Sequence, residues 1–187
     1  MQLPEEVMLT FTEAEKLFAE GDIDGAINRI DASLPSLEGD ILEADALNNK
    51  GYYLLHQAKW QEAIHSFEKA FMIDPSFHAV SNHLAWAALM IGNWEGAEAL
   101  MNLFETKQAD YQALHLRNQA LIHTMEGNKF EAIELLQSAK EEDPYMAYVD
   151  LLLQVNGELQ GEEIVYPASD LQFKHLNSIL NSSDHLK

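Results

Sequence analysis

The eight histidines are the side chains in this sequence best suited to hold a metal ion, so their spacing is a first test for chemistry. None belongs to an H-E-x-x-H motif or a comparable ligand pattern. His115 and His123 lie two helical turns apart, with no carboxylate between them at ligand spacing. We therefore expect polar surface or groove positions, with no metal site and no cofactor, for His56, His65, His78, His83, His115, His123, His175 and His185.

Catalytic motifs are a second test, and the sequence contains no G-x-S-x-G, no P-loop and no dinucleotide-binding fingerprint. It also contains no cysteine, which excludes a thiol nucleophile. The acidic pairs Glu141-Glu142 and Glu162-Glu163 fall at helix ends or in loops. They are more simply solvated charge than an acid/base pair, which would need one pKa shifted by burial. We predict that the chain is not an enzyme.

The strongest pattern is an internal repeat, and its best copy runs over 44–77. Small residues stand at Gly51, Ala63 and Ala70, and large apolar residues stand between them, at Leu47, Leu54, Trp60, Phe67 and Ile73. An antiparallel helix pair explains this distribution, because small residues allow close approach and large ones fill the remaining space. Pro75 then stops the second helix. The pattern returns from His78 and from Ala113, and a degenerate copy precedes it.

A period of about 34 residues with these features resembles the tetratricopeptide repeat family. The resemblance covers roughly residues 7–146 and implies an all-α fold. That fold is a right-handed superhelical solenoid of antiparallel helix pairs, with about four repeats plus C-terminal capping helices. The sequence departs from the family at Lys50, Phe104 and Ala109, where a leucine, a small residue and a proline are usual.

The repeat register divides the chain into expected segments. These are a leader at 1–6, a degenerate repeat at 7–40, repeats at 44–77, 78–111 and 113–146, and capping helices at 147–187 with a loop near 156–168. Helices are predicted at 7–20, 24–33, 42–57, 60–72, 78–91, 94–107, 112–126, 129–141 and 145–156.

Turn residues and a final amphipathic helix complete this outline. Pro35, Ser36, Gly39 and Asp40 indicate a loop after the second helix. The turns at Gly92 and Gly127 suit a positive φ, whereas the corresponding residue of the best repeat, Ala58, does not. The last helix is predicted to start at a Ser169 or Asp170 cap, with an apolar side made by Leu171, Phe173, Leu176, Ile179 and Leu180.

The resemblance implies that the first helix of each pair lines a concave face. Transferred by offset, the predicted partner-binding residues are Asn48, Asn49, Tyr52, Leu55, His56, Asn82, His83, Trp86, Leu89, Met90, Arg117, Asn118, Leu121 and Met125. Asparagine amides carry a donor and an acceptor and can pair with the backbone of an extended peptide. Tyrosine and tryptophan add apolar area with a polar handle. The alternative is that these asparagines cap turns or simply face water.

One arrangement known in this family is absent. Repeat-containing chaperone co-factors grip the C-terminal carboxylates of a partner with lysine, arginine and asparagine at fixed groove offsets. One frame here gives Phe11, Glu15, Asn49, Ala79 and His83, and the other gives Asn48, Tyr52, His83, Leu114 and Asn118. Neither frame supplies the required cations.

The net charge is −20 and is concentrated at the start, since residues 1–43 hold 11 acidic against 2 basic residues. Phosphate backbones would be repelled, so we expect no nucleic-acid partner. The acidic excess favours either a basic protein partner near the first repeat or a solvated face that keeps the solenoid soluble.

The start MQLPEEVML lacks a basic segment and a long apolar run, and no stretch reaches membrane-spanning length, so we expect a cytoplasmic protein.

Three functions remain open at this point. The first is a non-enzymatic adaptor that binds a partner peptide or helix in the concave groove. The second is a chaperone of the bacterial secretion type that holds a client protein before export. The third is a structural subunit that forms a homo-oligomer through the terminal helix at 169–182.

Overall fold

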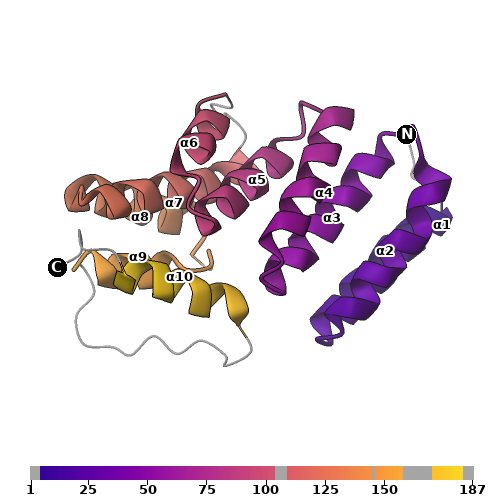
Figure 1. Ribbon diagram of the computed structural model, residues 1–187, viewed down its shortest axis with the longest axis horizontal. Coiled ribbons are helices and arrows are strands. Elements are labelled where there is room, and N and C mark those ends of the chain that lie inside the picture. The colour runs from indigo at the N-terminus through magenta and orange to yellow at the C-terminus, as the bar shows by residue number, and fades with distance from the viewer. Residues whose placement is uncertain (1–4, 104–108, 145, 158–169, 183–187) are drawn as a thin grey trace. The chain divides into compact units, whose positions relative to one another are not determined.

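The computed structural model describes residues 5–103, 109–144, 146–157 and 170–182, and the regular secondary structure of these residues is α-helical throughout (Figure 1). The chain divides into two compact units, Met1–Ala87 and Ala88–Lys187. The boundary falls within one helix, α5, which runs from His78 to Met90.

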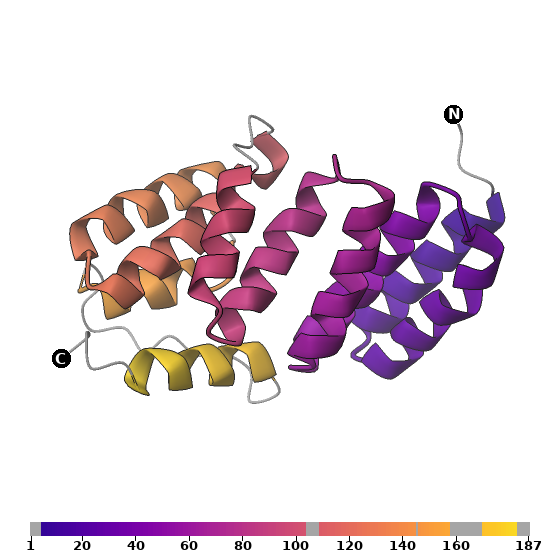
Figure 2. The same ribbon diagram turned by 45° about the horizontal axis from the view of Figure 1, so that its top comes forward.

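The first unit contains most of α5 and two helix hairpins, which are coloured indigo to magenta in Figure 2. They comprise α1 (Glu5–Ala19), α2 (Ile23–Leu37), α3 (Leu42–His56) and α4 (Trp60–Ile73). Each helix packs on the next, so α2 contacts both α1 and α3. The sequence prediction of four helices here is confirmed.

The second unit contains α6 (Trp94–Leu103), α7 (Ala109–Glu126), α8 (Lys129–Glu142), α9 (Val149–Val155) and α10 (Leu171–Ser182). The predicted end of α6 near residue 107 and most of the predicted loop at 156–168 lie outside the described residues. Helix α9 packs on α7 and α8, and α7 also contacts α6. The segment boundaries proposed for the repeats stay a prediction.

Small residues at the repeat offsets let the helices approach closely. Ala14, Ala26, Ala63, Ala70, Ala97, Ala120, Ala132 and Ala139 are all fully buried. At Gly51 the contact is closer still, because a Cβ placed there would lie 2.5 Å from Cε1 of Phe67. Phe67 is itself fully buried and closes the space between α3 and α4. Glycine is therefore required at position 51 by the ring that faces it.

The end of α2 corrects the sequence prediction. The sequence predicts a loop at Pro35 and Ser36, but α2 continues through both of them to Leu37. Proline removes one backbone hydrogen bond from a helix, yet the last turn still forms because Leu37 is 3% exposed and anchors it to the core. Burial of one leucine therefore outweighs the local preference.

The turn between α3 and α4 also differs from expectation. Ala58 adopts a φ of 54°, in the left-handed region that Gly21, Gly92 and Gly127 occupy in the other hairpins. The backbone path of this turn is thus kept although the residue is unfavourable. Packing of α4 on α3 supplies the compensation, since isolated alanine disfavours this conformation by about 1–2 kcal/mol.

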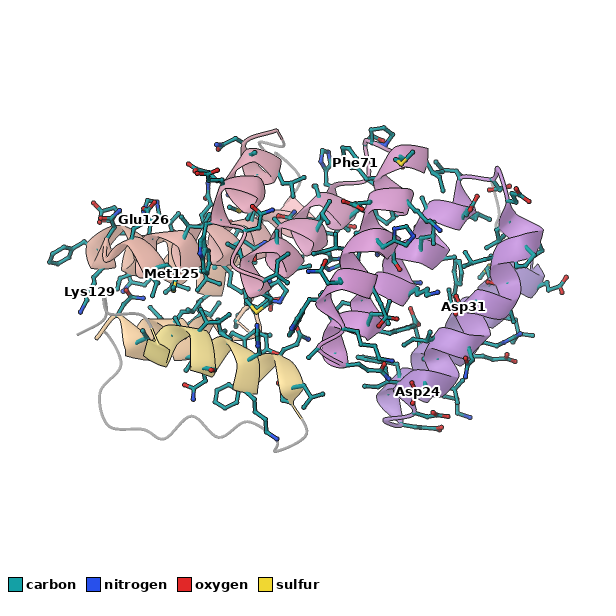
Figure 3. All side chains as sticks on the ribbon, in the orientation of Figure 1. Asp24, Asp31, Phe71, Met125, Glu126 and Lys129 are labelled. Carbon is teal, nitrogen blue, oxygen red and sulfur yellow. The ribbon has the colours of Figure 1, made fainter. Side chains whose placement is uncertain are left out.

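Polar contacts join the first hairpin to the second. Figure 3 labels Asp24 and Asp31, both on α2. The ammonium of Lys50 donates to Asp31 at 2.6 Å, and the amide of Gln57 donates to Asp24 at 2.8 Å. Lys50, which departs from the family pattern, is therefore explained by its ion pair with Asp31.

The start of α10 is fixed by the residue predicted as its cap. Asp170 accepts a hydrogen bond from the backbone N–H of Phe173 at 2.8 Å. The hydroxyl of Tyr148 donates to the same carboxylate at 3.1 Å. Leu176 and Leu180, on the apolar side of α10, are buried.

No helix within the described residues combines the length and apolarity that a membrane span needs.

The contact at Gly51 leads to a test of stability. Gly51→Ala should lower the free energy of unfolding by about 1–2 kcal/mol, because the new methyl group displaces a sealed ring. Alanine is the better helix former by roughly 1 kcal/mol, so any net loss must come from this contact. Urea denaturation of Gly51→Ala, Phe67→Leu and the double variant would measure it. If the clash is real, Phe67→Leu costs less in the Gly51→Ala background than alone; equal costs would contradict it.

Candidate functional site

A cleft of about 250 Å³ opens on the first unit where α1, α3 and α5 meet. Its lining combines one carboxylate, two amides and four rings, from Glu15, Phe18, Asn48, Asn49, Tyr52, Tyr53 and His83. Each of these three helices is the first of its predicted pair. Four of the seven lining residues, Asn48, Asn49, Tyr52 and His83, are among those that the sequence predicts to bind a partner.

The rings around the cleft pack on one another. Phe18 stacks on Tyr53 with ring centres 4.9 Å apart, and it meets Tyr52 at 5.6 Å with a tilt of 57°. His56 makes edge-type contacts with both Phe18 and Tyr52, with ring centres 4.8 Å apart in each pair. Tyr52 also lies 5.6 Å from the ring of His83. Because these pairs fix the rings before any partner arrives, little rotamer freedom remains to be lost on binding.

The two neighbouring asparagines of α3 have different environments. Asn48 is 8% exposed, and its amide oxygen lies 3.0 Å from Nδ1 of His83. An amide oxygen only accepts, so His83 donates through Nδ1. Asn49 is half-buried, and its side chain makes no hydrogen bond with the described residues. Asn48 therefore holds α5 against α3, whereas Asn49 presents its amide to the cleft.

The charge of the cleft is negative. Glu15 is exposed at its edge, and the described lining includes no lysine or arginine. Burial, followed by the nearby carboxylate of Glu15 and then Tyr52, raises the pKa of Tyr53 to about 12. The phenol of Tyr53 is thus held in its neutral form under a negative local potential.

Two other predicted groove residues of the first unit are buried. Asn82 is 3% exposed and donates from its amide to the backbone oxygen of His78 at 3.2 Å. Trp86 is 2% exposed and is one of the largest fully enclosed side chains. Truncating such a ring typically costs about 3–5 kcal/mol of stability, so Trp86→Ala would not measure binding alone. Neither side chain offers an accessible face to a partner.

The predicted groove residues of the second unit are also buried. Met90, Arg117, Asn118 and Leu121 are 2%, 5%, 0% and 0% exposed. The guanidinium of Arg117 donates to the side-chain oxygen of Asn118 through Nη2 at 3.0 Å and to the sulfur of Met146 at 3.8 Å. The backbone oxygen of Met90 lies 2.6 Å from Nε2 of His175. Their assignment to a binding surface stays a prediction, while Asn49, Tyr52 and His83 line an open cleft.

Sequence reasoning did not place Glu15, Phe18 or Tyr53 in the binding site. Glu15 occurs only in the rejected carboxylate-clamp frame. The offsets would have found two of them, because Glu15 corresponds to Tyr52 and Phe18 to Leu55 once the first copy is aligned with the second. Tyr53 follows Tyr52 directly and does not share a repeat offset with any predicted groove residue, so the sequence pattern did not point to it.

The part of the chain that the structure describes holds no group of three or more histidine and carboxylate side chains that could bind a metal ion.

A smaller cleft of about 90 Å³ on the second unit is bounded by α6 and α7. Its lining includes Glu98, Glu126 and His123. The carboxylate of Glu126 already accepts from Asn128 at 2.9 Å, so the cleft of the first unit is the better developed site.

Within each unit, successive helices pack on one another as an all-α repeat fold requires, and the predicted fold class is confirmed. Comparison with protein families is consistent, since residues 54–120 match the family described as tetratricopeptide repeat. The resemblance to the tetratricopeptide repeat family that the sequence suggests is thereby confirmed.

Solved structures share the fold at low sequence identity. MamA residues 41 to the end from Desulfovibrio magneticus RS-1 gives a TM-score of 0.61 at 16% identity, covering 98% of this chain and 99% of that one. YrrB, described as a TPR protein with an unusual peptide-binding site, gives 0.55 at 15% identity, covering 95% of this chain and 87% of that one. No curated protein matches the chain.

The environment of Tyr53 leads to a test by pH. Its raised pKa means that the folded state retains the phenolic proton between pH 10 and about 12, whereas the unfolded state loses it near pH 10. The resulting stabilisation is complete below pH 10 and is lost as pH rises toward 12, by on the order of 2 kcal/mol. Urea denaturation from pH 8 to 11.5 should therefore show a shallower decline for Tyr53→Phe than for the parent. Parallel declines would contradict the assigned burial.

Proposed function

We propose that this protein is a non-enzymatic interaction module that binds an extended segment of a partner protein in the α1–α3–α5 cleft. Tetratricopeptide repeats serve as protein–protein interaction modules, which supports the general class. The observation that carries the proposal is the cleft itself, in which a fixed cluster of rings stands beside the amide of Asn49.

The residues of the cleft suit a polypeptide ligand. The amide of Asn49 can donate to a peptide carbonyl and accept from a peptide N–H, whatever the partner's side chains are. Tyr52 is 37% exposed and offers a ring face with a hydroxyl, a combination typical of binding hot spots. The description of YrrB as having a peptide-binding site adds support by analogy.

The size of the cleft also favours a peptide. Small-molecule sites commonly enclose about 300–1,000 Å³ and cover most of the ligand, whereas this cleft has about 250 Å³ and opens to solvent through the exposed Tyr52 and Glu15. Such a volume accommodates one or two side chains of a segment that continues along the surface. A compact cofactor would remain largely uncovered.

Self-association through 169–182 is the weaker alternative. The apolar residues Leu176 and Leu180 of α10 are 0% and 2% exposed, and His175 is bonded to the backbone of Met90 within the same unit. Pairing of two chains through this face would first require α10 to leave it. A secretion-type chaperone would use the same cleft as an adaptor and differs only in holding its client soluble.

Substitutions in the cleft test the proposal. A displayed library of random 12-residue peptides is selected on the parent protein, and the affinities of the enriched peptides are measured by fluorescence anisotropy. Tyr52→Ala should weaken binding at least tenfold, the loss expected of a hot-spot ring. Asn49→Ala should weaken it about threefold to tenfold, because one or two peptide hydrogen bonds are lost.

Matched controls separate binding from folding. Phe130 is 84% exposed on α8, so Phe130→Ala removes an aromatic ring away from the cleft. Asn28→Ala does the same for an exposed amide on α2. Both controls should bind like the parent, with circular dichroism unchanged in all four variants. Enriched peptides that bind Tyr52→Ala and Asn49→Ala as tightly as the parent would exclude the cleft as the site.

A further inference from the structure

We propose that the cleft selects a cationic side chain of the bound segment, arginine above lysine, and seats it between the rings of Phe18 and Tyr52 and the carboxylate of Glu15. This inference rests on the proposed function and adds the chemical class of the ligand. It follows from the charges around the cleft, the arrangement of its rings and the acceptors that remain available.

The carboxylate of Glu15 lacks a cation of its own. Three positive side chains on α1, α2 and α3 are engaged elsewhere: Lys16 with Glu20 at 3.9 Å, Arg29 with Glu13 at 2.6 Å, and Lys50 with Asp31 at 2.6 Å. Glu15 forms no ion pair with any described residue. Three carboxylates of the first unit, Glu13, Glu20 and Asp31, are paired with these cations. Glu15 is one of those that are not, and it is the carboxylate in the lining of the aromatic cleft.

The rings provide the complementary surface for a cation. Tyr52 is 37% exposed, and Phe18 is half-buried with its ring stacked on Tyr53, so part of each ring stays accessible in the cleft that both line. A cation within about 6 Å of a ring centre is attracted by about 0.5–1 kcal/mol at an exposed site and by about 2 kcal/mol or more when desolvated. An anionic side chain would meet the same ring faces and Glu15 with repulsion. An aliphatic side chain would leave the carboxylate unpaired.

The acceptors distinguish arginine from lysine. Glu15 offers two carboxylate oxygens, and Asn49 offers an amide oxygen not engaged by the described residues. A guanidinium is planar, so it can stack on a ring while its N–H groups reach a carboxylate in a bidentate pair. A lysine ammonium carries the same charge, but it cannot stack on a ring or form a bidentate pair with a carboxylate. Arginine is therefore preferred, and lysine is second.

The test uses the enriched peptides described above, at pH 8. Arginine or lysine should be enriched at one peptide position. Replacing that arginine by citrulline, which has nearly the same shape without the charge, should weaken binding at least tenfold. Replacement by lysine should weaken it less than citrulline does.

Variants of Glu15 assign the effect to this carboxylate. In Glu15→Gln, the penalty for citrulline should fall below threefold. In Glu15→Arg, a peptide with glutamate at the same position should bind better than the arginine peptide. Glu6→Gln removes the same charge from an exposed position of α1 outside the cleft lining and should keep the full citrulline penalty. This control separates a local contact from the general attraction of a basic peptide to an acidic protein.

The outcomes distinguish the two proposals. Peptides that depend on Tyr52 but show no preference for a cation, or a citrulline penalty unchanged in Glu15→Gln, would overturn the cation site alone. A citrulline peptide that binds as well as the lysine peptide would also overturn it. Failure to obtain any peptide whose binding depends on Tyr52 would overturn the proposed function, and the cation site with it.

Discussion

The contact between the backbone at Gly51 and the ring of Phe67 sets the distance between α3 and α4, and the cleft depends on it. The same ring lies 5.5 Å from His83, which in turn bonds the side chain of Asn48. A continuous series of contacts thus runs from the core of one hairpin to the helix that follows it. The side chains that a partner would meet are held in place by residues that it does not touch.

Most of the fold follows from the sequence, because close helix packing demands small residues at fixed intervals. The alanines at those offsets are buried as the period requires. The deviations occur where local and tertiary preferences conflict. Pro35 stays helical because Leu37 buries its side chain, and Ala58 accepts a left-handed backbone because α3 and α4 must pack. A pattern of residue types records the local preference, and it does not record how strongly the packing opposes that preference.

The candidate site was less predictable than the fold. A repeat offset tells which side of a helix a residue occupies, but the depth of that side depends on the neighbouring helices. Asn49 and Tyr52 therefore line an open cleft, whereas Asn82 and Trp86 share the expected face and are buried. Phe18 belongs to the degenerate first copy, whose weak pattern hides its relation to Leu55. The strongest repeats thus predicted the helices, and the weakest one supplied part of the cleft.

The acidic character of the first unit permits two readings, solubility or recognition, and the ion pairs help to separate them. A purely solvating face would leave its carboxylates distributed in water, with no relation to a particular apolar surface. Glu13 and Asp31 are instead joined to cations that link neighbouring helices, so part of the negative charge stabilises the stack. Glu15 has no such cation, yet it is also tied to a particular apolar surface. It lines the cleft with the rings of Phe18 and Tyr52, and its charge contributes to the raised pKa of the buried Tyr53 phenol. A carboxylate that lines the same cleft as several aromatic rings is matched to an incoming cation, which both the charge and the rings attract.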